Sequence, residues 1–389
     1  MKCRRLFLFE GLYLLFCAFI VFIVMPQLCK RLAYSLYYDP PPQATSIDQI
    51  QTENKARLHS AQQYLLQNDL HYLFDHFKLN QTKFCFVIIT IPREGSYLTQ
   101  TAAALIHQLS FLSNFTFTVY NLAAAGTHSE AFKLSSKIPV TNSRNLDPPP
   151  GDKFIKEKLD YLSALRWCHQ KKSIYNIVLE DDAMADPGFA HKLNFILRYC
   201  LKDTTGDTWG LMKLYYPEKY QGWGNNRSCI GELLVLTVLL GGTLVILSGI
   251  VLPSPIDWWQ FKINETIFKW RLLVSLSLVL YLILSFGRPH WEEVRKLSPF
   301  LINVVPARGC CTPAVLYPRS HLQSLIDYLD SFNCTERVPV DIAIDSWIAE
   351  KRLNKLLAVP NLFNHIGLMS SLPKGMKPSS EFHLLFPPK

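Results

Sequence analysis

The stretch Ile174-Tyr175-Asn176-Ile177-Val178-Leu179-Glu180-Asp181-Asp182 decides the fold of this chain. Its apolar part predicts a buried strand, and three acids follow where the carboxyl end of that strand meets solvent. In open α/β sheets this edge is where ligands bind. Carboxylates clustered there suit a hard divalent cation that keeps some waters and also holds phosphates. A run of charges alone is more often a solvated surface. Here the preceding strand and the membrane segments described below favour the other hypothesis, which is chemistry on a nucleotide diphosphate.

Short apolar runs alternate with longer amphipathic runs around this stretch. Strands are predicted at Lys83–Ile91, Phe115–Tyr120 and Trp209–Tyr215, and helices at Ser96–Leu112, Phe154–Gln170 and His191–Leu201. This alternation predicts a largely parallel, doubly wound α/β sheet. Earlier, one or two helices are predicted within Ile47–Phe77. Later segments are expected to return to the fold: Leu301–Leu316, helices at His321–Phe332 and Asp341–Leu353, and a strand at Lys355–Val359.

Three apolar segments explain why 49% of the 389 residues are hydrophobic. They are Leu6–Met25, Leu233–Leu252 and Leu272–Phe286, and a spanning helix needs about 20 mostly apolar residues. The first segment is interpreted as an uncleaved anchor rather than a cleaved signal peptide, because no small-x-small cleavage site follows it. The second segment carries no charge. The third is shorter, and a buried core helix is the alternative for it.

The second and third segments would form a hairpin that returns the chain to the side it left. We therefore expect a cytosolic tail over 1–5, an anchor over 6–28, a stalk and helical region over 29–82, an inserted transmembrane hairpin over 230–288, and one domain built from 83–229 and 289–389. Flanking charges orient the anchor only weakly. Glycosylation sequons at Asn80, Asn114 and Asn333 favour a lumenal domain, and Asn264 in the hairpin link should stay unmodified.

Composition and missing motifs exclude several classes of protein. Seven of the ten cysteines fall in the presumed lumenal part, where disulfides are plausible although their pairing cannot be deduced. The net charge of +9 comes from scattered basic residues, so a membrane surface or a phosphate-rich ligand is a simpler partner than nucleic acid. The absence of Gly-x-x-x-x-Gly-Lys, Gly-x-Gly-x-x-Gly and Gly-x-Ser-x-Gly motifs disfavours P-loop ATPases, dinucleotide enzymes and the usual serine hydrolases.

A set of motifs distributed through nearly the whole chain carries a family resemblance. The motifs are Lys156-Glu157-Lys158-Leu159-Asp160-Tyr161, Glu180-Asp181-Asp182-Ala183, Lys213-Leu214-Tyr215-Tyr216-Pro217-Glu218, Leu297-Ser298-Pro299, Val304-Val305-Pro306-Ala307, Cys310-Cys311-Thr312-Pro313-Ala314, Pro360-Asn361-Leu362, His365-Ile366-Gly367-Leu368 and Ser370-Ser371-Leu372. Through them the chain resembles the GPI-glycan N-acetylgalactosamine transferases of the post-GPI-attachment-to-proteins group. A more distant likeness is to the N-acetylglucosaminyltransferase IV enzymes. The resemblance implies a glycosyltransferase-A-like fold whose two parts, 83–229 and 289–389, are interrupted by the membrane hairpin.

The resemblance also implies a function. It implies a multi-pass Golgi membrane protein with a lumenal catalytic domain. This hexosaminyltransferase would move N-acetylgalactosamine from UDP-GalNAc to a mannose of the GPI anchor, with Mn²⁺ as the cation. GPI-anchored proteins or the GPI glycan would be the acceptor. The alternative is a non-catalytic membrane scaffold or cargo factor that binds GPI-anchored proteins, with the acids serving only structure. A channel or carrier is disfavoured because Glu10 is the only charge inside a predicted span.

The resemblance implies a metal and donor site. Glu180, Asp181 and Asp182 match the metal and donor motif of the family, and Asp182 is expected to contact the metal. His365 matches a second metal or diphosphate ligand, or else it is a packed loop histidine. Thr90 and Arg93 follow the first strand, where the nucleotide should lie, and Arg93 would offer its fork to phosphate. An acid is expected at position 92 in this family, and Pro92 stands there instead.

Two further pairs of residues complete the expected site. Lys156 and Asp160 lie one helical turn apart and would reach the uridine, although an ordinary surface ion pair explains the same spacing. An inverting transfer needs a carboxylate near the anomeric carbon, and Asp341 matches the aspartate of the related transferases. Asp345, one turn later, is the second candidate for this base. Asp341 would alternatively serve as a helix N-cap after Pro339.

Overall fold

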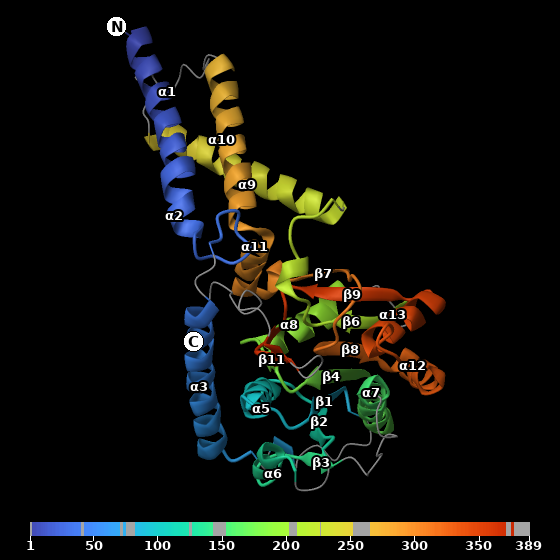
Figure 1. Cartoon of the computed structure of the whole chain (residues 1–389). Helices are drawn as coiled ribbons and strands as arrows, with labels where there is room; N and C mark the ends of the chain where they lie inside the picture. The colour runs from blue at the N-terminus through green and yellow to red at the C-terminus, as the bar shows by residue number, and fades with distance from the viewer. Residues whose placement is uncertain are drawn as a thin grey trace. The chain divides into compact units, whose positions relative to one another are not determined.

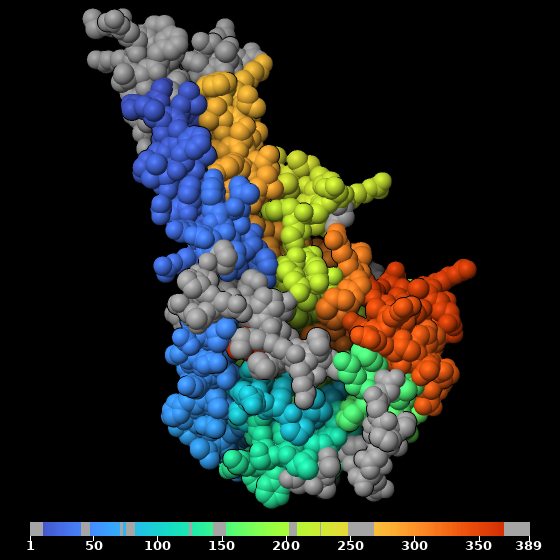
Figure 2. Space-filling view, viewed as in Figure 1, coloured from blue at the N-terminus to red at the C-terminus, as the bar shows by residue number. Residues whose placement is uncertain are grey.

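The computed structural model describes residues 2–39, 43–70, 73–74, 82–123, 127–142, 153–201, 208–225, 227–251, 265–370 and 375–376. These residues form two compact units. The helical unit comprises described residues of Met1–Thr45 and Glu218–Val294, and the sheet unit comprises described residues of Ser46–Pro217 and Arg295–Phe382. Segments before and after the hairpin region therefore build one sheet unit. Figure 2 shows their cyan, green and red-orange surfaces adjoining one another within that unit.

The sheet unit contains an eight-stranded sheet with the order β3-β2-β1-β4-β8-β6-β9-β7. The strands are β1 (Phe84–Thr90), β2 (Phe115–Asn121), β3 (Val140–Asn142), β4 (Tyr175–Glu180), β6 (Trp209–Lys213), β7 (Asn303–Pro306), β8 (Ala314–Pro318) and β9 (Asn354–Val359). Six strands run in one direction, and only β7 and β8 run against them. Strand β8 enters between β4 and β6. The prediction of a mostly parallel α/β sheet is confirmed.

Helices cover both faces of the sheet (Figure 1). One face carries α5 (Tyr97–Leu109) and α8 (Phe189–Phe195), which continues as the π-helical turn η2 (Ile196–Cys200). The other face carries α7 (Lys153–Gln170), α12 (Arg319–Ser331) and α13 (Val340–Glu350). Strand β1 shows why its sequence is continuously apolar: Phe84, Phe86 and Ile88 enter one core, whereas Cys85 and Val87 enter the other.

Smaller elements complete this unit. Helix α3 (Gln43–Gln67) packs Ala61 and Leu65 into the first core, which confirms a helix in part of the region 47–77; residues 71–72 and 75–77 lie outside the described part. The sequence did not predict α6 (Ser129–Leu134), β3, β5 (Ala183–Ala185) or β10 (Phe363–His365). Strands this short leave no readable period in the sequence.

Two disulfides occur within the described residues. Cys85 on β1 is joined to Cys168 on α7, with their Cα atoms 5.7 Å apart, and this bond fastens the helix to the sheet. The second joins the adjacent residues Cys310 and Cys311 in the loop between β7 and β8. Five further described cysteines are thiols: Cys17, Cys29, Cys200, Cys229 and Cys334. Disulfides were expected in this part of the chain, but their pairing required the structure.

The helical unit holds three helical stretches long and apolar enough to cross a membrane: Gly11–Cys29, Arg227–Leu247 and Phe268–Phe286. The first runs through α1 (Lys2–Phe19), η1 (Ile20–Val24) and α2 (Met25–Cys29); the others lie in α9 (Arg227–Val251) and α10 (Glu265–Phe286). Helices α9 and α10 pack against each other. A short helix, α11 (Arg288–Val294), follows. Each stretch overlaps a predicted span. The length and composition of these three helices indicate a membrane protein.

Candidate active site at the carboxyl edge of the sheet

The three acids lie at the carboxyl end of β4, and a small second sheet fixes them there. Strand β5 begins directly after Asp182 and pairs antiparallel with β10, so that His365 faces Ala183. The backbone N–H of Ile366 donates to the carbonyl oxygen of Asp182 over 2.9 Å. This pairing brings His365 beside an acid that lies far from it in sequence.

Glu180, Asp182 and His365 form a cluster able to hold a metal ion. One ligand atom from each lies within 4.8 Å of the others, and Nε2 of His365 is 3.2 Å from Oδ2 of Asp182. Asp182 is fully buried. Gly367 lies directly against the same carboxylate. A Cβ added to Gly367 would lie 2.8 Å from Cγ of Asp182 and closer still to its Oδ2. Two carboxylates and an imidazole suit a divalent transition-metal ion, so these residues fit the expected cation.

Asp181 turns toward the end of β1 rather than toward this cluster. Its Oδ2 accepts a 2.7 Å hydrogen bond from the Thr90 hydroxyl, and its Oδ1 is paired with Nη2 of Arg93. Nη1 of Arg93 donates to Oδ2 of Asp182 over 2.9 Å. Burial lowers the pKa of Arg93, but the charges of Asp182 and Asp181 outweigh this and raise it. Burial raises the pKa of Asp181, and Arg93 opposes that shift.

The structure therefore places the Arg93 fork across Asp181 and Asp182. The sequence predicted that this fork would bind phosphate, and that role stays a prediction. Thr90, the last residue of β1, and Arg93 contact the acids, and nucleotide binding at these two residues stays a prediction. The guanidinium holds two neighbouring carboxylates together, which like-charge repulsion would otherwise separate.

His128 belongs to this network and was missed by sequence reasoning. It precedes α6, its Nδ1 accepts from the backbone N–H of Ala131, and its Nε2 is 2.8 Å from the Thr90 hydroxyl. Because Nδ1 accepts, Nε2 carries the proton and donates to Thr90, which in turn donates to Asp181. Burial and the charge of Arg93 lower the pKa of His128, which favours the neutral form of the ring. A single histidine outside any motif gave no signal in the sequence.

A second group of residues lies on the first two turns of α13. Oδ2 of Asp341 accepts a 3.0 Å hydrogen bond from the backbone N–H of Cys311. Asp345 pairs with Lys355 over 2.7 Å. The helix N-cap is Pro339, so Asp341 lies inside the first turn rather than at the N-cap position. The structure thus keeps both candidate bases near one loop and gives Asp345 a cationic partner.

The loop with the Cys310–Cys311 disulfide connects the two groups. The carbonyl oxygen of Pro313, at one end of the loop, accepts from the backbone N–H of Glu180 over 2.8 Å. The carbonyl oxygen of Cys310 accepts from the ammonium group of Lys213. Lys213 is almost fully buried, and burial lowers its pKa to about 8, with Asp345 opposing this shift. Lys213 belongs to a quoted motif, but no role was assigned to it from the sequence.

The amino-terminal half of α7 contributes two more carboxylates. Lys156 and Asp160 form an ion pair of 2.9 Å, which is the ordinary interpretation of their spacing; contact with a uridine stays a prediction. Glu157 has its pKa raised to about 7, first by burial and then by the charges of Glu180, Asp341 and Asp160. The Glu157 carboxyl group is therefore affected by the charges of both the acidic cluster and the group on α13. The sequence motif contained Glu157, yet nothing in the pattern distinguished it from a surface acid.

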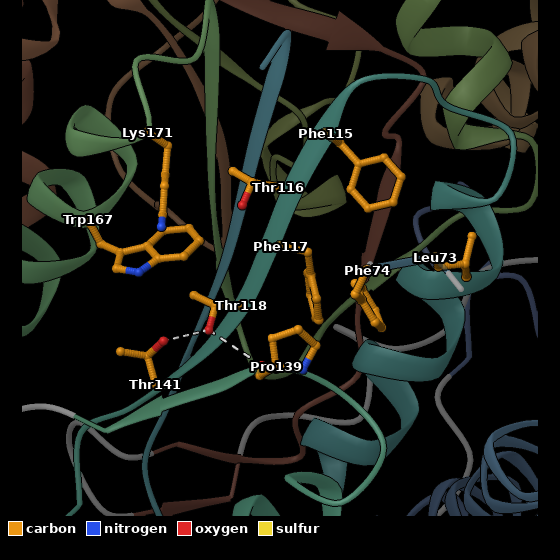
Figure 3. A pocket seen from close by; sticks show the side chains of 10 residues that line it. All are labelled: Leu73, Phe74, Phe115, Thr116, Phe117, Thr118, Pro139, Thr141, Trp167 and Lys171. Carbon is orange, nitrogen blue, oxygen red and sulfur yellow. Dashed lines mark hydrogen bonds between the residues drawn. The ribbon is translucent and has the colours of Figure 1, made fainter. Parts of the chain in front are cut away.

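A cavity of about 280 Å³ lies at the opposite end of the strands, near the start of β2 (Figure 3). The Thr118 hydroxyl bonds to Thr141 and to the carbonyl oxygen of Pro139 at its rim. Its wall consists of Leu73, Phe74, Phe115, Thr116, Phe117, Thr118, Pro139, Thr141, Trp167 and Lys171. None of the predicted site residues lines this cavity, which separates it from the acidic site.

Comparison with known proteins identifies the family. A family model described as GPI-N-acetylgalactosamine transferase PGAP4 matches residues 84–364. Among solved structures, a mannosyltransferase, PcManGT from Pyrobaculum calidifontis in complex with GDP-Man and Mn²⁺, matches with 11% sequence identity and a TM-score of 0.24. That match covers 44% of this chain and 48% of the mannosyltransferase, so this chain spans about half the length of that protein. Because the family match covers more than half of the sequence, the chain belongs to the GPI-N-acetylgalactosamine transferase PGAP4 family.

Proposed function

We propose that this chain transfers N-acetylgalactosamine from UDP-GalNAc to a mannose of the GPI glycan, in the Golgi lumen and with Mn²⁺. Membership of the family supports the donor sugar and the acceptor. The observation that carries the proposal is the cluster of Glu180, Asp182 and His365 at the carboxyl edge of the sheet. Its donor atoms suit a divalent cation, and its position suits a nucleotide.

The metal and donor part of the site would work as follows. A cation held by Glu180, Asp182 and His365 would neutralise the developing charge of the diphosphate leaving group. Arg93 keeps Asp181 and Asp182 side by side, and the bonds from His128 through Thr90 hold Asp181 in one orientation. Such fixed positions reduce the reorganisation that a transfer reaction would otherwise require.

The acceptor part of the site centres on Asp341. In an inverting transfer, this carboxylate would remove the proton from the attacking mannose hydroxyl. The N–H of Cys311 fixes one of its oxygens. Asp345 suits the role less well, because its charge is already matched by Lys355. Lys156 and Asp160, on α7, are proposed to contact the uridine.

The membrane spans fit an acceptor that is itself held in the bilayer. A GPI glycan can be reached only close to the membrane surface. A sheet unit tethered before residue 46 and again on both sides of the α9–α10 pair is kept near that surface. Tethering raises the effective concentration of enzyme at the acceptor.

The test is a transfer assay with the purified full-length protein. UDP-GalNAc, UDP-N-acetylglucosamine and UDP-galactose are each supplied with Mn²⁺ and a GPI acceptor in lipid vesicles. We expect transfer from UDP-GalNAc, loss of transfer on chelation, and loss of transfer in Asp182→Asn. A wild-type protein that binds no UDP-sugar would contradict the proposal and favour the scaffold function. Glycan mapping and microscopy test the compartment: we expect a glycan on Asn333, none on Asn264, and Golgi staining.

A further inference from the structure

The motif Leu297-Ser298-Pro299 lies outside the metal and acceptor groups and takes no part in them. It lies at the start of the second segment of the sheet unit, in the turns η4 (Arg295–Leu297) and η5 (Pro299–Leu301). Here Leu297 is 83% exposed and Phe300 is 82% exposed, with Leu301 exposed beside them. Single exposed apolar residues are common, but several held together mark an interaction site.

Hydrogen bonds hold the two turns in a fixed conformation. The Ser298 hydroxyl accepts from the N–H of Phe300, and the Ser298 carbonyl accepts from the N–H of Leu301 over 3.1 Å. The next residue, Ile302, is buried in the first core. Lys296 forms a 3.0 Å ion pair with Asp186, which follows β5. The exposure of Leu297 and Phe300 is therefore built into the fold and connected to the sheet that carries the metal cluster.

Aromatic and basic side chains extend this surface onto the end of α8 and η2. The Phe195 ring lies 5.4 Å from Phe300 and 5.0 Å from Tyr199, measured between ring centroids. Tyr199 is exposed, and the Arg198 guanidinium lies over its ring at 5.4 Å. Protein surfaces that enter the boundary between lipid headgroups and acyl chains typically combine exposed Leu and Phe with Tyr and Arg, as this surface does.

The covalent chain keeps this surface close to the bilayer. The third candidate span ends at Phe286, and Leu297 follows eleven residues later. Seven of the intervening residues form α11. A seven-residue helix and four further residues reach at most roughly 25 Å, the length they would have if the four were fully extended. The link therefore limits the separation between Phe286, at the end of the candidate span, and Leu297 to roughly 25 Å, whatever its path.

We propose that Leu297, Phe300, Leu301 and Tyr199 form a membrane-docking surface that enters the lipid interface and fixes the height and tilt of the sheet unit. Lipid is the occupant because the surface follows a membrane span at short reach and combines apolar, aromatic and basic groups. The lipid contact stands by itself. Its consequence, presentation of the site to a bilayer-held glycan, rests on the proposed function.

Photocrosslinking of the full-length protein tests the contact directly. A benzophenone amino acid replaces Phe300 in one variant and Leu297 in another, and the protein is reconstituted in phosphatidylcholine vesicles that contain an alkyne-tagged phosphatidylcholine. Phe132 on α6, which is 75% exposed, provides a matched aromatic control in the same unit. We expect lipid adducts at 297 and 300 several-fold above those at 132. Adduct levels equal to the control, or adducts to a second copy of the chain, would overturn the proposal.

A transfer assay tests the consequence. The double variant Leu297→Ser/Phe300→Ser is expected to lose several-fold in rate on a GPI acceptor in vesicles. It should keep the wild-type rate on a GPI glycan released from its lipid. Phe132→Ser should match the wild type on both acceptors. An equal loss on both acceptors would sink the docking role. If the wild type modifies neither acceptor while position 300 still labels lipid, the proposed function fails and the docking surface stands.

Discussion

The backbone amide of Cys311 donates a 3.0 Å hydrogen bond to Oδ2 of Asp341. Both Cys310 and Cys311 have positive φ angles, 71° and 69°, a backbone conformation that residues other than glycine rarely adopt. Such backbone conformations cluster at functional sites, where the surrounding structure maintains them. Here the disulfide between the two residues and the bond from Lys213 to the Cys310 carbonyl maintain the loop. The bond to Asp341 thus belongs to an organised loop at the proposed acceptor site.

Replacing Asp341 by Asn should separate catalysis from donor binding. Asn keeps the shape of the side chain and an oxygen for the Cys311 amide, but it cannot take a proton. We expect kcat to fall by about 10² or more, with the affinity for UDP-GalNAc and Mn²⁺ unchanged. Initial rates and equilibrium binding of UDP-GalNAc measure the two effects. Asp345→Asn is the matched control and should cost less, because Asp345 is paired with Lys355. A larger loss in Asp345→Asn would exchange their roles.

Removing the disulfide should affect the acceptor step more than the donor site. In Cys310→Ser/Cys311→Ser the loop loses its covalent constraint, so the amide facing Asp341 moves. We expect transfer to fall about tenfold or more, as small misplacements at reacting groups do, while UDP binding is retained. Cys85→Ser/Cys168→Ser is the control, because it removes the other disulfide and should lower thermal stability first. Unchanged transfer in the Cys310 and Cys311 variant would contradict a positioning role for the loop.

Titration of Lys213 should make the transfer rate fall at alkaline pH, which appears as an alkaline limb in the plot of rate against pH. Burial lowers its pKa to about 8; Asp345 and Asp341 oppose the shift, Lys355 reinforces it, and the Tyr216 ring lies 5.3 Å away. As pH rises through about 8, the ammonium loses its proton and its charged bond to Cys310. A depressed lysine pKa means that the unfolded state binds more protons between about 8 and 10.5, so stability rises with pH there. We therefore expect activity to fall without unfolding.

The variant Lys213→Arg separates this effect from other alkaline losses. Arginine keeps its charge far above pH 8, so the limb should move to higher pH. In Lys213→Gln, activity should be lower and flat across the same range. The measurements are kcat from pH 6.5 to 9.5 and the melting temperature at each pH. A wild-type limb that persists at the same pH in Lys213→Arg would rule out Lys213 as its origin.

Long, strongly patterned elements could be predicted from the sequence, whereas contacts made by short ones could not. Strand β1 was predicted because both its faces are buried, which gives a continuous apolar run. The antiparallel direction of β7 and β8 is set by their pairing with β9 and β4, which no local sequence pattern encodes. Strands β5 and β10, of three residues each, have no period, yet they place His365 against Asp182.

The candidate site shows the same division. Glu180, Asp182 and His365 were expected from motifs, and the structure brings their ligand atoms together. His128 and Lys213 were missed, because their roles come from burial and from partners that are distant in sequence. Arg93 was expected at the donor phosphates, and its bonds to Asp181 and Asp182 could be seen only in three dimensions. The charge and pKa of a buried group depend on its neighbours in space, and these neighbours cannot be read from their order in the sequence.

Gly367 offers a test of the metal cluster that leaves its ligands in place. A methyl group there would lie 2.8 Å from Cγ of Asp182, so Gly367→Ala should push this carboxylate out of position. We expect the Mn²⁺ concentration for half-maximal transfer to rise about 10- to 100-fold, as when supporting groups around a metal are disturbed. His365→Ala should show a shift of the same sign. Gly222→Ala is the control, because among the described residues only its own chain neighbours lie within 4 Å of the added methyl group. Direct Mn²⁺ binding, followed by electron paramagnetic resonance of the free ion, separates weaker binding from slower chemistry. An unchanged Mn²⁺ requirement in Gly367→Ala, in a protein that melts like the wild type, would show that Asp182 does not hold the metal.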